Sequence, residues 1–266
     1  MSSYIGRHAE LYDLFYGDKP YAAEALFVHH CLQRYGSGNT NRILELACGT
    51  GSHAFALEEF NYQILATDYS ADMLAIAKQK ARERASAVEF SLQDMTQLAD
   101  PERPYDAVVC LFDSIGYAVT NEKISQLLQG VRRQLQDGGL FIFEFWHGAA
   151  MLRSYDPLRV RRWQTAQGEL LRIAETRLDC ARQVSYVTYH IYEFESDGKY
   201  AKLSETQVNR YFLMQEMAYW LTNVGFAPVK YFAGFTEDQS IKEDTWHVVA
   251  VARRADVPGK PASAVV

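Results

Sequence analysis

Short apolar runs alternate with amphipathic stretches in the first half of the chain. The runs have the length and composition of strands buried on both faces of a parallel sheet, and they occupy residues 43–48, 63–68, 106–112 and 139–146. The stretches between them place apolar residues at helical spacing over 52–60, 72–84 and 121–136. Ser70 is suited to cap the second helix, and Asp137-Gly138-Gly139 predicts a turn after the third. Strands that alternate with helices predict βαβ units and a Rossmann-like, mostly parallel α/β sheet.

The pattern changes after Trp146. Residues 158–213 predict antiparallel β-structure, because 184–195 is rich in β-branched and aromatic residues and Asp197-Gly198 predicts a turn. The remaining segments predict a strand at 208–213, a helix at 215–224 and a terminal antiparallel pair at 228–235 and 246–253. We therefore expect one domain over residues 1–254, with a β-rich insertion at about 153–213, and a disordered tail at 255–266.

Composition and charge narrow the classes of function. The formal net charge of −6 argues against sequence-independent nucleic-acid binding, which requires a basic surface. The chain has no apolar run of the ~20 residues that a membrane span needs, and its first residues carry no apolar signal-peptide core. The cysteines form no ligand-spaced cluster, so we expect reduced thiols, no metal and a cytoplasmic protein; they are Cys31, Cys48, Cys110 and Cys180.

A turn of small residues follows the first predicted strand. Gly49 and Gly51 in this turn are expected to let backbone amides approach a ligand, in front of a helix that begins near Ser52. Asp68 ends the next strand, 17 residues after Gly51, where a carboxylate can accept both hydroxyls of a ribose. Asp94 follows the third strand and is placed to bond an adenine amino group. The alternatives are a helix cap for Asp68 and a simple turn residue for Asp94.

These residues resemble a known family. The segments Glu45-x-Ala47-Cys48-Gly49-x-Gly51, Asp68-x-Ser70-x-x-Met73-Leu74 and Asp94-Met95 are similar to successive motifs of class I S-adenosylmethionine-dependent methyltransferases. The resemblance spans about residues 10–147, with Ala47 in place of the usual first glycine, and 228–253 fits the family's antiparallel seventh strand. It implies a seven-stranded sheet, S-adenosylmethionine as cofactor and S-adenosylhomocysteine as product.

The resemblance also implies a set of cofactor-binding residues. It places Gly49 and Gly51 beside the methionine moiety, Asp68 on the ribose, and Met73, Asp94 and Met95 around the adenine. The full implied set is Tyr12, Tyr21, Glu45, Ala47, Cys48, Gly49, Gly51, Asp68, Tyr69, Met73, Asp94, Met95, Leu111 and Phe112.

A narrower resemblance concerns the acceptor. Segments 12–16, 21–24, 48–53 and 112–117 look like the N,N-dimethyltransferases of nucleotide-linked amino sugars, of the desosamine and mycaminose type. This match covers the core of the chain and not the insertion. It implies that Tyr12, Tyr16 and Tyr21 line the cofactor site; the alternative is an aromatic packing face with polar tips.

Methyl transfer requires an aligned acceptor, and an amine acceptor must lose one proton before it attacks. Asp113, Glu144 and His147 lie near the carboxyl ends of the fourth and fifth strands, and we predict His147, Asp113 and Tyr16 as the catalytic set. The alternatives are a polar loop residue for His147 and a helix cap for Asp113. The insertion and the N-terminal helix are expected to form a lid that excludes water.

The insertion is rich in arginine. Seven arginines stand against four acids between Arg153 and Arg182, although the chain is acidic as a whole. Because the guanidinium fork suits phosphate, we predict that one or two of these arginines meet the diphosphate of a nucleotide-linked sugar; solvated surface charge is the alternative. The predicted substrate-binding residues are Tyr117, Trp146, Arg161 and Arg162.

The preferred hypothesis is N-methylation of an amino sugar or a related small-molecule acceptor. An O-methyltransferase of a sugar or other metabolite and a non-catalytic S-adenosylmethionine-binding protein are the two alternatives. A nicotinamide dehydrogenase fits less well, because it usually has a full GxGxxG motif, whereas here position 54 is Ala and Ala47 stands in place of the usual first glycine of the turn. A homodimer is neither required nor excluded by the sequence.

Overall fold

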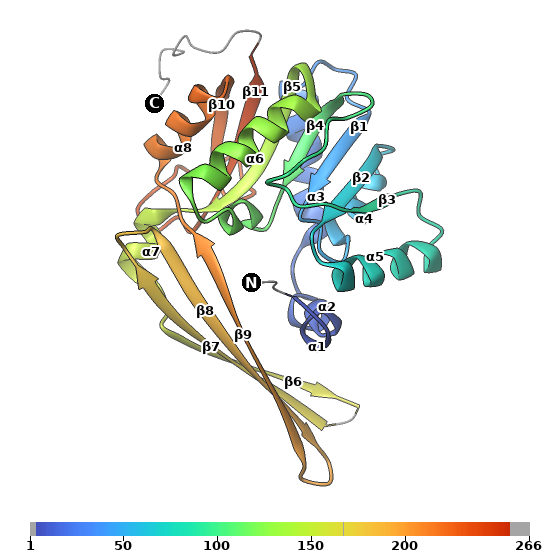
Figure 1. Cartoon of the computed structure of the whole chain (residues 1–266), viewed down its shortest axis with the longest axis vertical. Coiled ribbons are helices and arrows are strands. Elements are labelled where there is room, and N and C mark those ends of the chain that lie inside the picture. The colour runs from blue at the N-terminus through green and yellow to red at the C-terminus, as the bar shows by residue number, and fades with distance from the viewer. Residues whose placement is uncertain (1–3, 167, 256–266) are drawn as a thin grey trace.

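Seven strands form the main sheet of this computed structural model, which describes residues 4–166 and 168–255 (Figure 1). The order across the sheet is β10-β11-β5-β4-β1-β2-β3. The strands are β1 (Arg42–Leu46), β2 (Gln63–Asp68), β3 (Glu89–Leu92), β4 (Tyr105–Cys110), β5 (Leu135–Trp146), β10 (Phe226–Ala233) and β11 (His247–Arg254). β1 to β5 are parallel, whereas β11 runs antiparallel to both β5 and β10. The predicted parallel α/β sheet with a terminal antiparallel pair is confirmed.

Helices cover both faces of this sheet. Successive residues of a strand point to opposite faces, and Ile43 packs with α3 (Tyr21–Tyr35), α4 (Ser52–Glu58) and α5 (Ala71–Glu83). Leu44 packs on the other face with α6 (Asn121–Gln134) and α8 (Met214–Asn223); α6 crosses the near face in Figure 1. The central strands are therefore mostly apolar, because both of their faces are buried, whereas the edge strand β3 is largely exposed. Within the described ranges, no helix combines the length and apolarity needed to cross a membrane.

Of the two features predicted at helix ends, the structure confirms the cap of α5 and contradicts the turn after α6. The Ser70 side chain accepts a hydrogen bond from the Met73 amide, which confirms the predicted cap of α5. The turn expected after α6 does not separate that helix from β5, which begins directly at Leu135. Instead, the pairing of β5 with β4 jumps from Leu135 to Leu140, and Gly138 adopts φ 75° within this bulge.

The second sheet is an antiparallel meander of four strands in the order β6-β7-β8-β9. The strands are β6 (Leu158–Thr165), β7 (Gly168–Asp179), β8 (Val184–Glu195) and β9 (Tyr200–Arg210). This confirms the β-rich insertion, with β8 at its predicted bounds. The strand expected at 208–213 is wrong in extent, because β9 pairs with β8 along its whole length and ends at Arg210. The predicted tail lies outside the described residues from position 256 onward.

The short N-terminal helices lie against both sheets. Figure 1 shows α1 (Arg7–Glu10) and α2 (Tyr12–Phe15) below the seven-stranded sheet and beside the β6–β9 ribbon. Phe15 packs with Leu170 and Ile191 of the second sheet. The Gly6 amide donates to Asp72 Oδ2 of α5 at 2.6 Å. The N-terminal segment therefore links the two sheets across the space between them. The connections that complete the chain include the 3₁₀ helix η1 (Ser114–Tyr117) and α7 (Gly148–Ser154).

Candidate active site

A cavity of about 660 Å³ lies where the parallel strands end. One wall is formed by residues after β1, β2, β4 and β5, the edge at which open α/β sheets bind ligands. The opposite wall comes from β6 to β9 and from α2, as expected for a lid. The sequence-predicted residues that line this cavity are Tyr12, Tyr16, Ala47, Gly49, Asp68, Tyr69, Met73, Phe112, Asp113, Tyr117, Trp146 and Arg161.

The turn after β1 is held by the carboxylate at the end of β2. Asp68 Oδ2 accepts a hydrogen bond from the Gly49 amide at 2.9 Å, and Asp68 Oδ1 accepts one from the Ser70 amide at 2.8 Å. Burial raises the pKa of Asp68, although these backbone hydrogen bonds act to lower it. Gly49 itself adopts φ 57°, and an added Cβ would lie 3.2 Å from the Met73 methyl group. The turn, Asp68 and Met73 thus form one continuous surface of the cavity.

This surface fits an adenosyl group. Each oxygen of Asp68 accepts one N–H and keeps a lone pair that can accept a ribose hydroxyl. Tyr12 and Met73 add buried apolar area beside it, which suits a purine ring. The donor set and the size of the cavity therefore agree with the cofactor that the motifs imply.

Seven predicted cofactor residues lie outside the lining of this cavity: Tyr21, Glu45, Cys48, Gly51, Asp94, Met95 and Leu111. Asp94 is exposed and accepts hydrogen bonds from the Thr96 amide and hydroxyl, which is the turn role stated as its alternative. Met95 packs against the core under α6. Asp94 therefore does not converge with Asp68 on this cavity, and its contact with adenine stays a prediction.

Gly51 is required by packing within the protein. It does not line the cavity, and a Cβ at this position would lie 2.9 Å from Phe90 of β3. Its φ of 82° is also a conformation that side-chain-bearing residues rarely adopt. Packing of the turn against the sheet therefore favours glycine here, and the contact of Gly51 with the cofactor stays a prediction.

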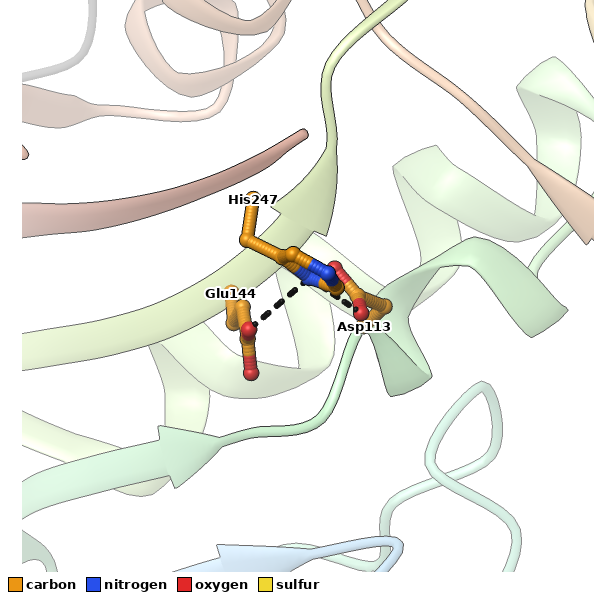
Figure 2. Close-up of side chains that lie close together, drawn as sticks. All are labelled: Asp113, Glu144 and His247. Atoms are coloured by element: carbon orange, nitrogen blue, oxygen red, sulfur yellow. Dashed lines mark ion pairs between the residues drawn. The ribbon is translucent and has the colours of Figure 1, made fainter. Parts of the chain in front are cut away.

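Three ionisable side chains meet at the floor of the cavity (Figure 2): Asp113 from the loop after β4, Glu144 from β5 and His247 from β11. His247 Nδ1 lies 2.8 Å from Asp113 Oδ2 and 3.1 Å from Glu144 Oε1, and Figure 2 shows the three side chains turned toward one another. Glu144 Oε2 accepts a hydrogen bond from the Phe112 amide at 2.7 Å. Asp113 Oδ1 is buried and has no hydrogen-bond partner among the described residues. One carboxylate oxygen in the cluster is thus left for a ligand.

The surroundings of this cluster shift the pKa values of Asp113 and His247. Burial, and then repulsion by Glu144, raise the pKa of Asp113 to about 7, although His247 acts to lower it. Burial lowers the pKa of His247, but attraction to Asp113 and Glu144 outweighs it and raises that pKa to about 11. At neutral pH the cluster therefore pairs an imidazolium with an Asp113 carboxyl that titrates within the working range.

The histidine at the cavity is His247 and not His147. The His147 Nδ1 atom lies 3.2 Å from the Thr245 carbonyl oxygen, and burial lowers the pKa of this side chain. Glu144 and Trp146 line the cavity, and His147 does not. His247 is paired with Trp146 at the start of β11. Because β11 is antiparallel, its amino end meets the carboxyl ends of the parallel strands, and that topology is the signal that could have identified His247.

The cluster also has the composition of a metal site, which the sequence did not predict. The ligand atoms of Asp113, Glu144 and His247 lie within 4.8 Å of one another. A metal ion bound there would displace the proton from His247 Nδ1.

The second sheet brings only one of the two predicted arginines to the cavity. Arg161 lines it, whereas Arg162 lies 3.7 Å from Glu169 and is largely exposed. Neighbouring residues of a strand point to opposite faces, so only one of this pair can reach the site. Sequence analysis did not single out several further lining residues: Tyr4, Lys19, Arg172, Tyr189, Gln207 and His247.

Comparisons with known proteins agree with this geometry. Residues 43–139 match a family model described as a methyltransferase domain. A putative methyltransferase from Geobacillus sp. (strain WCH70) is 28% identical over 91% of this chain and 96% of its own length. A dTDP-3-amino-3,4,6-trideoxy-alpha-D-glucopyranose N,N-dimethyltransferase from Streptomyces venezuelae is 33% identical, over 52% of this chain and 57% of that protein.

Solved structures show the same fold. A sugar N-methyltransferase from a Streptoalloteichus species superposes with a TM-score of 0.77 at 24% identity, over 96% of this chain and 97% of that one. The predicted fold class and the resemblance on which it was based are confirmed. The chain therefore contains a methyltransferase domain, and the protein is an S-adenosylmethionine-dependent methyltransferase with the class I fold.

Proposed function

We propose that this enzyme methylates the amine of a small-molecule acceptor, and that an amino sugar, in nucleotide-linked form, is the preferred one. The observation that carries the proposal is the unpartnered, buried Asp113 Oδ1 beside Glu144 in the cavity. Two buried carboxylates attract a cationic ammonium group, and His247 neutralises only one of them. The Streptomyces venezuelae relative, named as a sugar N,N-dimethyltransferase, supports the acceptor class.

Asp113 is the group that we assign to accept the amine proton. Its pKa of about 7 leaves much of the carboxyl ionised at neutral pH, and the ionised carboxylate can accept the proton of a bound ammonium group directly. His247 holds the Asp113 side chain in place through its contact at Oδ2. Glu144 in turn contacts His247 and accepts a hydrogen bond from the Phe112 amide. Tyr16, which contacts the Phe112 ring, forms the adjoining wall.

The cofactor surface has a separate role. S-adenosylmethionine supplies a methyl group on a positively charged sulfur, ready for in-line transfer. Asp68 would hold its ribose, and the turn at Gly49 would accommodate its methionine part. Tyr12 and Met73 would exclude water beside the adenine.

The first test is the isosteric variant Asp113→Asn. Loss of the proton acceptor is expected to lower kcat by about 100-fold or more, with the affinity for S-adenosylmethionine unchanged. In the wild type, kcat/KM is expected to rise with pH through about 7 as Asp113 ionises, and this limb should vanish in the variant. Asp238→Asn, at an exposed position, is the matched control. Equal kcat in the two variants would refute the role of Asp113.

The second test is a panel of acceptors with methyl-labelled S-adenosylmethionine. Amino sugars should be labelled on nitrogen, and matched sugars that carry a hydroxyl in place of the amine should not. Labelling of the hydroxyl series would identify an O-methyltransferase instead. Tight cofactor binding without turnover on any member would favour the non-catalytic alternative.

Three further proposals concern the extent of the domain, the location of the enzyme and its partners. We propose that residues 1–254 act as one unit, because both sheets contribute to a single cavity. We also propose a cytoplasmic enzyme, in keeping with four free cysteines, of which Cys31, Cys48 and Cys110 are buried. Nucleic acid is not expected as a partner, given the net charge of −6, and a membrane is not expected because the sequence has no apolar run of ~20 residues.

A further inference from the structure

A buried arginine stands in the cavity wall opposite the parallel sheet. Arg172 of β7 is 7% exposed and lines the cavity. Its guanidinium carbon lies 4.6 Å from the centre of the Phe15 ring and 5.2 Å from that of Trp163. The rings of Tyr16 and Tyr189 are at 5.3 and 5.2 Å. Four aromatic rings thus fix the position of this cation.

The four rings do not supply hydrogen-bond acceptors for the N–H groups of the Arg172 guanidinium. Arg172 Nη1 is buried without a hydrogen-bond partner, and no ion pair to Arg172 occurs among the described residues. Aromatic faces attract a cation but offer no lone pair in the plane of its N–H groups. A buried charge without a hydrogen-bonded partner is costly, so a partner from outside the chain is needed.

Two more arginines face the same side of the sheet. Arg161 is the direct cross-strand partner of Arg172, and Arg159 is paired with Ala174 one step along. All three arginines line the cavity, and within the described part of the chain none of them forms an ion pair. Like charges directly opposite each other destabilise a sheet. An anion with more than one charge would remove this repulsion.

Among the described residues, no acid near this wall forms an ion pair with the three arginines. Glu169 lies 3.7 Å from Arg162, which is on the other face of β6. Asp156 lines the cavity but accepts a hydrogen bond from the Leu158 amide at 3.2 Å. The cavity therefore has an acidic floor at Asp113 and Glu144 and a basic wall at the three arginines. Such a separation of charge suits an acceptor that is cationic at one end and anionic at the other.

We propose that Arg172, with Arg161 and Arg159, binds a phosphate or diphosphate group of the acceptor. The inference rests on the proposed function only in that the anion belongs to the acceptor. The guanidinium fork matches phosphate oxygens, and three arginines on one face exceed what a single carboxylate would need. Arg172 is the central residue, because it alone of the three is buried and fixed in advance.

The test measures binding and needs no methyl transfer. Pyrophosphate is titrated by calorimetry into the full chain saturated with S-adenosylhomocysteine, for the wild type, Arg172→Gln and the control Arg162→Gln. Arg172→Gln is expected to weaken pyrophosphate binding by about tenfold or more, since a hydrogen bond to a charged group is lost. Arg162→Gln removes the same charge from the opposite face and is expected to leave the affinity within about twofold.

Several outcomes would overturn the proposal. One is equal pyrophosphate affinity in Arg172→Gln and the wild type. Another is acetate binding as tightly as pyrophosphate, which would indicate a carboxylate site. A loss of S-adenosylhomocysteine affinity in Arg172→Gln, with pyrophosphate binding unchanged, would assign Arg172 to the cofactor. If Arg172→Gln does not fold, the double variant Arg159→Gln/Arg161→Gln, at exposed positions, makes the same comparison. If no amino sugar is labelled in the acceptor panel while pyrophosphate binding is intact, the amine acceptor is rejected and the phosphate site at Arg172 is retained.

Discussion

At the scale of single residues, the buried acids of β1 and β2 behave differently from each other. Asp68 is held by two backbone amides, whereas Glu45 Oε2 is buried without a hydrogen-bond partner among the described residues. Burial, and then repulsion by Asp68, raise the pKa of Glu45 to about 8. Glu45 therefore carries a proton in the folded protein under neutral conditions. This protonation keeps two neighbouring carboxylates from being charged together beneath the cavity.

Glu45→Gln tests this protonation. The raised pKa means that the favourable state of Glu45 is fully present below the ordinary value of 4.5 and is lost as pH rises through about 8. The wild type should thus lose stability between pH 5 and pH 8, and Glu45→Gln should lose less, by about 1–3 kcal/mol at pH 8. Thermal unfolding at several pH values measures this difference. Glu59→Gln, at an exposed position of the same region, serves as control, and identical pH dependence in both variants would contradict the assignment.

At the scale of elements, the N-terminal segment is tied to both sides of the cavity. His8 Nδ1 lies 2.8 Å from Glu205 Oε2 of β9, and the Tyr4 amide donates to Glu205 Oε1 at 3.0 Å. On the other side, the Tyr4 carbonyl accepts a hydrogen bond from Ser70 at 2.9 Å. Glu205 is thus the residue by which β9 holds α1 over the cavity. Burial acts to raise the pKa of Glu205, but His8 outweighs it and lowers that pKa.

Glu205→Gln is expected to loosen this segment. Hydrogen exchange of the backbone amides of residues 7–15 should become about tenfold faster, since a charged hydrogen bond that orders them is removed. The KM for the acceptor should rise while Tm changes little, because Glu205 is not part of the cores on either face of the seven-stranded sheet. Glu195→Gln, near the end of β8, is the matched control. Unchanged exchange in Glu205→Gln would show that the other contacts of the segment, among them the Gly6–Asp72 hydrogen bond and the packing of Phe15, hold it without Glu205.

At the scale of the whole molecule, each of the two sheets contributes a different part of the cavity lining. The parallel sheet supplies the turn at Gly49, Asp68 and the acidic floor. The antiparallel sheet supplies the basic wall and closes the cavity. Neither sheet encloses the cavity alone, so ligand binding should stabilise the assembled molecule.

The cofactor can be tested at this scale by thermal unfolding with S-adenosylmethionine and with NAD. A concentration of about 100 times Kd stabilises the folded state by about 2.7 kcal/mol. For a chain of this size the corresponding rise in Tm is about 5–10 °C. NAD at the same concentration is the control and should leave Tm unchanged, because Ala54 stands where the dinucleotide motif has its last glycine. A rise with NAD alone would contradict the cofactor assignment.

Prediction from the sequence succeeded where the signal is local. The apolar runs identified the strands β1, β2, β4 and β5, and β-branched and aromatic composition identified β8 at its observed bounds. Prediction was weaker where contacts with residues distant in the sequence determine the local structure. β5 follows α6 without a break because the bulge at Gly138 absorbs the predicted turn within the ladder to β4. Gly51 is constrained by Phe90, 39 positions further along the chain.

The sequence by itself determined the class of fold, the cofactor turn and Asp68, since each depends on residue types at short, regular spacing. The tertiary structure alone decided which side chains share the cavity. His247 reaches Asp113 because β11 is antiparallel, and Arg172 reaches the cavity because of the pairing of β7 with β6 and β8. The physical reason is that the local sequence pattern indicates which side chains are buried. The pairing of charges across a cavity depends instead on the order and direction of the strands.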